Sequence, residues 1–371
     1  MLDFFGINKK NFSIKNDEIL SIHYLRGIAA LLVALYHLAE SKETPLALVS
    51  VSKWMASGVD VFFVISGFVI YLNYLNKNLS PLSFLIRRFI RVIPLYWIFL
   101  IMLIILNFLF PKLAFNNVSI NFESVYKSLL FIPYFDIKNH EIWPILIPGW
   151  TLNYEIFFYL LFSFFLFKTK KHILISMAVI FSILLITGFL IKTNNAILLT
   201  YTNPLLLEFL SGMFLANLYF RSKFFESKSL LISISFILIG ITGFMLFKDL
   251  TVRGISWGVP ATLVVIGCLM IEKNNKFKYY KIPYLLGSSS YSIYLSHLFT
   301  LGLVKYIFIK LKLGYNTPLS FLFLTLFSLI SIAFVGIIVH IIVEKPIIKL
   351  LLKYVYLGEK RTNKKILVDN Q

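Results

Sequence analysis

The chain has 371 residues, of which 58% are hydrophobic and only 14% are charged, and its mean hydropathy is +0.82. This composition excludes an ordinary soluble domain, in which about half of the residues are apolar and about a quarter are charged. The single cysteine, Cys268, excludes internal disulfides and thiolate metal clusters, and we expect no bound metal. A net charge of +19 would suggest a nucleic-acid partner in a soluble chain. Here the basic residues lie between apolar runs, where they orient membrane helices, and we expect no nucleic acid.

Ten apolar segments approach the length of about 20 residues that crosses a bilayer as a helix. They predict an all-α, polytopic transmembrane bundle that forms a single domain over residues 1–371, with a core of about 20–350 between two short tails. The expected spans are 24–41, 58–75, 92–110, 150–167, 173–191, 198–219, 229–247, 254–271, 284–309 and 318–343.

The distribution of Lys and Arg predicts how these helices are oriented. If the N-terminus lies in the cytoplasm, the segments on that side carry 24 of the 36 basic residues and the opposite segments carry 11. Basic residues concentrate in cytoplasmic segments, so we expect both termini in the cytoplasm. The long polar segment 111–149, between the third and fourth spans, is then expected outside.

Two ionisable residues, Arg26 and His37, lie within the first expected span, "SIHYLRGIAALLVALYHLAE". An ionisable group inside a bilayer costs several kcal/mol unless it is paired or hydrated, so both residues point to a functional site. They are eleven residues apart. On a helix this spacing places them on one face, about 20° apart around the axis and roughly 16 Å apart along it.

Two carboxylates are expected at the depth of His37. Asp60 opens the second span and Glu155 lies early in the fourth, and both of these spans run inward in the expected orientation. An imidazole with carboxylates at one depth is the arrangement of a general base and its orienting partners. A proton pathway would give the same pattern, and each residue alone could simply pack in the core or reach the interface.

A basic cluster occurs in "SFLIRRFIRVIPLYW", residues 83–97. Arg88 and Arg91 are three residues apart with Arg87 beside them, and Pro94 fits the start of the third helix. Guanidinium groups bind phosphates through paired hydrogen bonds, so the cluster is a candidate phosphate clamp. Anchoring at the cytoplasmic face explains it about as well. The sequence has no glycine-rich phosphate loop, so arginines would have to hold a nucleotide.

Six segments appear in order along the chain: "LRGIAALLVALYH", "GVDVFFVISGFVI", "RRFIRVIPLYW", "GWTLNYEIFFYLLF", "SSYSIYLSHL" and "VEKP". Over about residues 20–350 they resemble the acyltransferase-3 family of integral membrane acyltransferases. The spacing of Arg26 and His37 and the FFxxSG sequence from Phe62 to Gly67 are the most specific parts. The "WTLNYE" form is most similar to members that modify exopolysaccharides.

The resemblance implies a multi-pass enzyme of the bacterial cytoplasmic membrane that transfers an acyl group, usually acetyl from acetyl-CoA. The acceptor would be a sugar hydroxyl of an envelope or secreted polysaccharide or of its lipid-linked precursor. For this chain the resemblance implies a catalytic His37, a functional Arg26, and an Arg88–Arg91 pair that matches the family's RxxR. The donor's phosphates would rest on that pair and on Arg87, and its pantetheine arm would pass Arg26 towards His37. Acyl-CoA is a substrate here, so no tightly bound cofactor is expected.

Within this mechanism, Asp60 or Glu155 is expected to orient the imidazole of His37. Asp60 is the closer candidate, because consecutive spans usually pack side by side. Tyr291 and His297 are second-rank candidates for the acceptor side. An acyl-histidine intermediate remains an open alternative to direct transfer.

Ser66 is a conceivable nucleophile in the second span. The pair Ser66–Gly67 more readily serves the close approach of two helices.

Two other functions would also place ionisable residues in a membrane. One is a proton-coupled secondary transporter of a small envelope metabolite, but such proteins show repeated halves and interrupted helices at matching positions, which we do not find in the sequence. The other is a non-catalytic scaffold or lipid-carrier-binding subunit. Labelling of a glycan from acetyl-CoA would separate the enzyme from both.

Overall fold

The computed structural model describes residues 18–40, 52–76, 80–110, 119–167, 170–226, 229–247, 252–274, 277–313 and 317–355. These residues contain helices and no strand, and eight of the helices are long and apolar enough to cross a membrane. The all-α, polytopic prediction is therefore confirmed.

The longer helices alternate with short helical pieces along the chain. The longer ones are α1 (Leu20–Ala39), α3 (Gly58–Asn76), α4 (Pro81–Leu109), α6 (Trp150–Phe165), α7 (Lys170–Leu190), α9 (Leu206–Arg221), α10 (Leu230–Leu246), α12 (Gly258–Lys273), α14 (Ser290–Lys310) and α15 (Pro318–Val339). The shorter ones are η3 (Lys53–Ser57), α5 (Phe122–Leu129), η4 (Ile147–Gly149), α8 (Ala196–Tyr201), η5 (Phe224–Glu226), α11 (Arg253–Ser256), α13 (Lys281–Ser288) and the π-helical η6 (His340–Glu344).

Each of the ten expected spans contains a helix, although three of the spans are interrupted. The spans 198–219, 254–271 and 284–309 are divided into α8 and α9, α11 and α12, and α13 and α14. The first break contains Pro204, which disfavours helical geometry in the residue before it. α6 and α10, with 16 and 17 residues, are not among the eight membrane-length helices, which count α8 with α9 and α11 with α12 as continuous stretches.

The third span begins earlier than the sequence predicted. α4 starts at Pro81, and the side chain of Ser80 caps it by accepting a hydrogen bond from the amide of Ser83 at 3.3 Å. Proline suits the first helical position because its missing N–H would have no partner there. Pro94 therefore lies inside the helix, and its expected place at a helix start is wrong. The earlier start carries the arginines of the basic cluster into α4.

Small residues let α3 and α9 cross closely. A Cβ added to Gly67 would lie 2.0 Å from the carbonyl oxygen of Phe209, and one added to Gly212 would lie 2.0 Å from that of Val64. Any side chain at these positions would force the two backbones apart, as in other membrane helix crossings built on small residues. The prediction that Gly67 allows close helix approach is confirmed.

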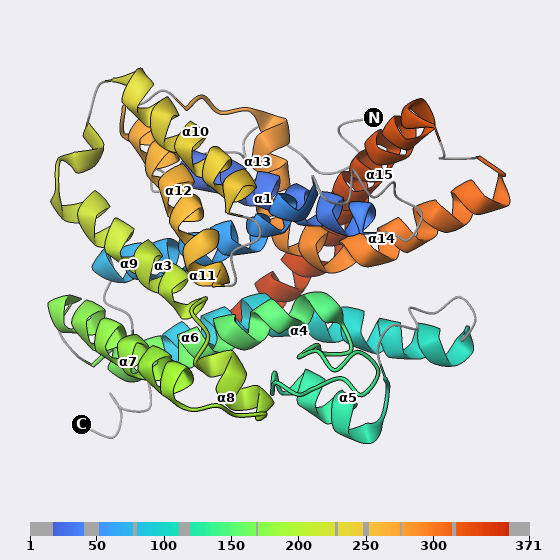
Figure 1. The fold of residues 1–371 in the computed structure, drawn as a ribbon, viewed down its shortest axis with the longest axis horizontal. Coiled ribbons are helices and arrows are strands. Elements are labelled where there is room, and N and C mark those ends of the chain that lie inside the picture. The colour runs from blue at the N-terminus through green and yellow to red at the C-terminus, as the bar shows by residue number, and fades with distance from the viewer. Residues whose placement is uncertain are drawn as a thin grey trace, which may run out of the picture.

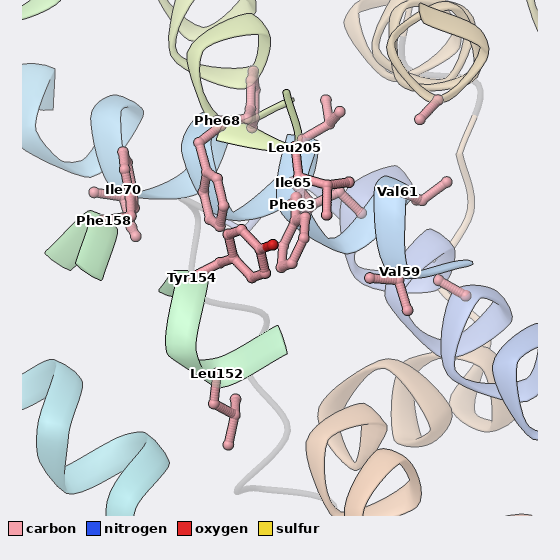
Figure 2. Close-up of a cluster of buried hydrophobic side chains, with 14 of the residues drawn as sticks. Val59, Val61, Phe63, Ile65, Phe68, Ile70, Leu152, Tyr154, Phe158 and Leu205 are labelled. Atoms are coloured by element: carbon pink, nitrogen blue, oxygen red, sulfur yellow. The ribbon is translucent and has the colours of Figure 1, made fainter. Parts of the chain in front are cut away.

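The helices form two groups that meet at α3 (Figure 1). In one group α14 and α15 form a hairpin at one end, α10 lies beside α12, and α1 packs against α3, α13 and α14. The other group contains α4, α6, α7 and α8 with α5 on its flank. Buried side chains of α3, Phe63 and Phe68, lie beside Tyr154 of α6 where the groups join (Figure 2).

The start of α1 is fixed by a carboxylate from a distant part of the sequence. Glu272, near the end of α12, accepts hydrogen bonds from the amides of Leu20 at 3.0 Å and Ser21 at 2.8 Å. A carboxylate satisfies amides that have no partner in the first helical turn and interacts favourably with the helix dipole. This contact places the start of α1 and the end of α12 on the same side of the bundle.

Candidate active site

A cavity of about 100 Å³ lies between α1, α3, α4, α6 and α14. Three arginines line it, Arg26 from α1 and Arg88 and Arg91 from α4, together with Glu155 of α6. One water needs roughly 10–15 Å³, so the cavity can hold several waters or a narrow chain. It is smaller than the roughly 300–1,000 Å³ of a typical ligand pocket. A large ligand could place only a slender part of itself inside.

The three arginines have few polar partners of their own. Arg26 donates from Nη2 to Ser290 Oγ at 2.9 Å, and the guanidinium of Arg88 lies 5.6 Å from the ring centroid of Phe84 and 5.8 Å from that of Tyr159. Within the described ranges none of the three forms an ion pair. Guanidinium groups that converge on one cavity without forming an ion pair make a site suited to an anion.

Glu155 is held on the cavity wall by two hydroxyl groups. Ser66 Oγ donates to its Oε1 at 3.3 Å, and the Tyr159 hydroxyl donates to the same oxygen. Tyr291, also on the wall, uses its hydroxyl to donate to the carbonyl of Val92 at 2.7 Å. Tyr291 therefore lies on the arginine side of the site.

A second carboxylate, Glu344, is buried near Arg26 and Arg91 and interacts with them electrostatically. Its Oε2 accepts a hydrogen bond from Ser292 Oγ at 2.6 Å and lies 2.7 Å from Nδ1 of His340. Glu344 and His340 belong to the π-helical turn η6, a kind of distortion that is frequent at functional sites. In the sequence this glutamate stands out only as part of the "VEKP" segment of the family resemblance.

His37 forms a separate cluster in the last turn of α1. Its ring stacks on that of His297, with the centroids 5.2 Å apart and the planes inclined by 28°. Its Nδ1 lies 3.5 Å from Oε2 of Glu40, and the hydroxyl of Tyr36 donates to the other oxygen of the same carboxylate. Sequence reasoning missed Glu40, although its position three residues after His37 places it on the same helix face.

His297 is completely buried, and its Nδ1 lies 2.6 Å from the carbonyl oxygen of Tyr294. A carbonyl can only accept, so Nδ1 must carry the hydrogen and Nε2 presents its lone pair. Among the described residues this Nε2 has no hydrogen-bond partner.

Two aromatic rings lie on the cavity wall, and one of them also contacts a histidine. Phe62 and Tyr294 line the cavity, whereas His37 and His297 do not. The rings of Tyr294 and His297 have centroids 6.0 Å apart, so Tyr294 contacts both regions. Its hydroxyl donates to the carbonyl of Pro148 at 2.9 Å and lies 3.0 Å from Thr151 Oγ1.

Asp60 is fully buried and is bound by Arg253, not by His37. Arg253 Nε donates to Oδ1 at 3.2 Å and Nη2 donates to Oδ2 at 2.9 Å. Among the described residues, no contact between Asp60 and His37 therefore supports the expected role of Asp60 as the closer partner of His37. The sequence offered no signal for this pair, because 193 residues separate its members.

The residues predicted from the sequence thus fall into three places. The cavity brings together Arg26, Arg88, Arg91, Glu155, Ser66 and Tyr291; the pair outside it is His37 and His297; Asp60 lies with Arg253. Arg87 is exposed and does not line the cavity.

These features define a multi-pass, helical membrane protein with an arginine-lined internal cavity. The acyltransferase-3 family model, described as an acyltransferase domain, matches residues 19–338, and the chain belongs to this family. It is similar to the exopolysaccharide production protein ExoZ of Rhizobium meliloti (strain 1021), with 35% identity over 302 residues that cover 79% of this chain and 90% of the relative. No solved structure matches the chain. The protein is a membrane acyltransferase.

Proposed function

We propose that this acyltransferase moves acetyl from cytoplasmic acetyl-CoA to a sugar hydroxyl of an exopolysaccharide or of its lipid-linked precursor. One observation supports acetyl-CoA as the donor. Arg26, Arg88 and Arg91 converge on one cavity without an ion-pair partner among the described residues. The acceptor class is suggested by the similarity to a relative named for exopolysaccharide production.

Charge and size together favour acyl-CoA as the donor. Its phosphates would pair with Arg88 and Arg91 through charge-assisted hydrogen bonds. Its thioester lies at the end of a long, narrow arm, the part of the molecule that a cavity of about 100 Å³ can take. The nucleotide would remain outside the cavity. Arg87 is exposed and could contact phosphates only outside the cavity. We therefore expect it to contribute less to donor binding than Arg88 and Arg91.

His37 is the proposed general base. With Nδ1 directed at Glu40, the neutral ring holds its hydrogen on Nδ1 and presents Nε2 to the acceptor hydroxyl. Nε2 takes the hydroxyl proton, the oxygen forms a bond to the thioester carbonyl carbon, and the carbon–sulfur bond breaks. The proton then passes from His37 to the thiolate, which leaves as free CoA. Glu40 stabilises the charged imidazole, the role that the acid has in a catalytic triad.

The contacts of Glu155 favour a role in donor binding over one beside His37. It shares the cavity with the arginines, where it balances part of their charge before the anionic donor enters. In this arrangement the enzyme lies in the bacterial cytoplasmic membrane with both termini in the cytoplasm. The arginines then lie towards the cytoplasmic donor, and His37 lies towards the outer acceptor.

The test is transfer of labelled acetyl. Membranes that contain the protein are incubated with acetyl-CoA labelled in the acetyl group and with exopolysaccharide from the producing strain, after mild alkali has removed its esters. Alkali-labile label should appear in the polysaccharide with wild-type protein and be absent with His37→Ala at equal protein level. Failure of the wild type to label the polysaccharide would disprove the proposed acceptor. Labelling by His37→Ala at the wild-type rate would disprove the proposed base.

A further inference from the structure

One edge of the Arg253 guanidinium faces Asp60, and the contacts on that edge fix the guanidinium in place. Nε and Nη2 donate to the two carboxylate oxygens at 3.2 and 2.9 Å, and Nη2 also donates to the carbonyl of Ala56 at 3.1 Å. Paired bonds of this kind fix the plane of the guanidinium as well as its position. These contacts use three of the five N–H groups of the side chain.

Two indole rings flank the same guanidinium. Its carbon lies 4.8 Å from the ring centroid of Trp257 and 5.5 Å from that of Trp150, within the range of cation–π attraction. The two N–H groups of Nη1 have no hydrogen-bond partner among the described residues, and 31% of the Arg253 side chain is exposed. Arg253 is therefore a preorganised donor with an unused edge.

Arg253 lies on the same side of the bundle as His37. Asp60 is in the first turn of α3, Arg253 begins α11, and His37 is in the last turn of α1. Tyr36 connects the two places, because its hydroxyl donates to Glu40 and it also interacts electrostatically with Arg253. No residue of the arginine-lined cavity takes part in this contact.

The charge around Arg253 indicates what its free edge can bind. Asp60 already neutralises the guanidinium, and a second carboxyl, Glu208, is buried beside Asp60. The group as a whole has no excess positive charge with which to attract an anion. Its open N–H groups are suited to uncharged oxygen acceptors, and hydroxyl-rich sugars supply these in pairs.

We propose that Nη1 of Arg253 binds uncharged oxygens of the acceptor sugar beside the hydroxyl that His37 deprotonates. Asp60 is then a positioning residue that acts through Arg253. This proposal rests on the proposed function, since it names the acceptor contact of the same enzyme.

The experiment compares Arg253→Gln and Arg253→Lys in the labelled-acetyl assay with oligosaccharides cut from the alkali-treated exopolysaccharide. Both variants lack the free edge of the guanidinium, but lysine keeps the charge that pairs with Asp60. Loss of a hydrogen bond from a charged group should raise the acceptor KM roughly ten- to a hundredfold in both variants, with the acetyl-CoA KM unchanged. Lys127→Gln is the matched control, because it removes the ion pair with Glu123 on α5 without contact to Arg253.

A purely structural role gives a different result. Arg253→Lys would then recover the wild-type acceptor KM, and that recovery would overturn the proposal. A matching rise in the acetyl-CoA KM would overturn it too, as would strong weakening of acceptor binding by added salt, the signature of an anionic ligand. If Arg253→Gln does not accumulate in membranes, Arg253→Lys alone decides. Absence of transfer by the wild type would instead count against the proposed function.

Discussion

The rings of Phe62 and Tyr294 meet edge to face on the wall of the arginine-lined cavity, with centroids 5.9 Å apart and planes at 65°, and Tyr294 also contacts His297. Phe62 also packs against both apolar clusters of the bundle, so it occupies the seam between them. We expect a thioester inside the cavity to reach His37 only after these rings move. We expect the same rings to keep water on the His37 side away from the donor.

Removal of one ring should therefore expose the thioester to water. We expect Phe62→Ala to hydrolyse acetyl-CoA several-fold faster than wild type in the absence of acceptor, while transfer to acceptor becomes less efficient. Release of free CoA measures the first effect, and labelled glycan measures the second. Phe157→Ala is the matched control, because that ring stacks on Tyr201 at 4.2 Å and does not line the cavity. Equal hydrolysis in both variants would contradict a separating role for Phe62.

The second prediction concerns the carboxylate beside His37. General-base catalysis typically contributes about 10²- to 10⁴-fold, so His37→Ala should lose a factor in this range. Glu40→Gln keeps the shape of the side chain but removes the charge that stabilises the imidazolium. Because 47% of the Glu40 side chain is exposed, solvent weakens its interaction and the loss should be smaller than that of His37→Ala. Turnover at saturating substrates is the measurement, and full activity of Glu40→Gln would remove Glu40 from the mechanism.

The third prediction separates the arginines that line the cavity from the one that does not. Arg88→Ala and Arg91→Ala should each raise the acetyl-CoA KM, by roughly tenfold or more for each lost charge-assisted contact. Arg87→Ala should change it little, because Arg87 is exposed and lies outside the cavity. All three substitutions remove one positive charge from the same helix, so any effect on membrane orientation would be shared. Equal acetyl-CoA KM values in the three variants would mean that the arginines only anchor the helix at the membrane face.

Periodicity and charge were enough to predict the helices and the arginines that line the cavity. Apolar length gave the spans, and the i, i+3 spacing of Arg88 and Arg91 placed both side chains on one face of α4. The start of α4 was placed too late because the apolar run begins after the arginines, whereas the capping signal of Ser80 and Pro81 precedes them. Local capping decides where a helix begins, and hydropathy alone does not detect it.

Tertiary contacts could not be predicted in the same way. Depth placed Asp60 and Glu155 near His37, but it fixes neither the rotation of a helix nor its neighbours. Arg253 reaches Asp60 from α11, and its sequence position indicated only topology. The contact between Glu40 and His37 could have been predicted from the sequence, because it follows from their helical spacing alone.

The fourth prediction tests the orientation of the bundle on segment 111–149. Residues 111–118 of this segment lie outside the described residues, whereas Ile137 is described and 65% exposed. In a Cys268→Ala background, Ile137→Cys should react with an impermeant thiol reagent on intact spheroplasts. Tyr354→Cys is the control from the C-terminal end of the chain, exposed to 66%, and it should react only after lysis. The reverse pattern would invert the topology and place the arginines away from cytoplasmic acyl-CoA.

The last prediction concerns Asp136, which organises the same segment. Its carboxylate accepts five hydrogen bonds at 2.6 to 3.1 Å, from the amide and hydroxyl of Ser119, the amide of Lys138, and the amide and side chain of Asn139. Burial opposes the charge of this carboxyl, but the bonds from Ser119 and Asn139 outweigh that effect and lower its pKa.

A lowered pKa in the folded state means that the stabilisation by Asp136 is fully present above the ordinary value of about 3.9 and is lost as pH falls through the folded value. Hydrogen bonds to a charged group contribute about 1.5–3 kcal/mol each, without simple additivity. Asp136→Ala should therefore speed hydrogen exchange in residues 119–141 by about 10²-fold or more at neutral pH. Asp136→Asn keeps one acceptor oxygen but has no carboxyl to titrate, so its exchange should be intermediate and independent of this acidic transition. If Asp136→Ala exchanges hydrogen at the wild-type rate, packing of α5 alone stabilises the segment.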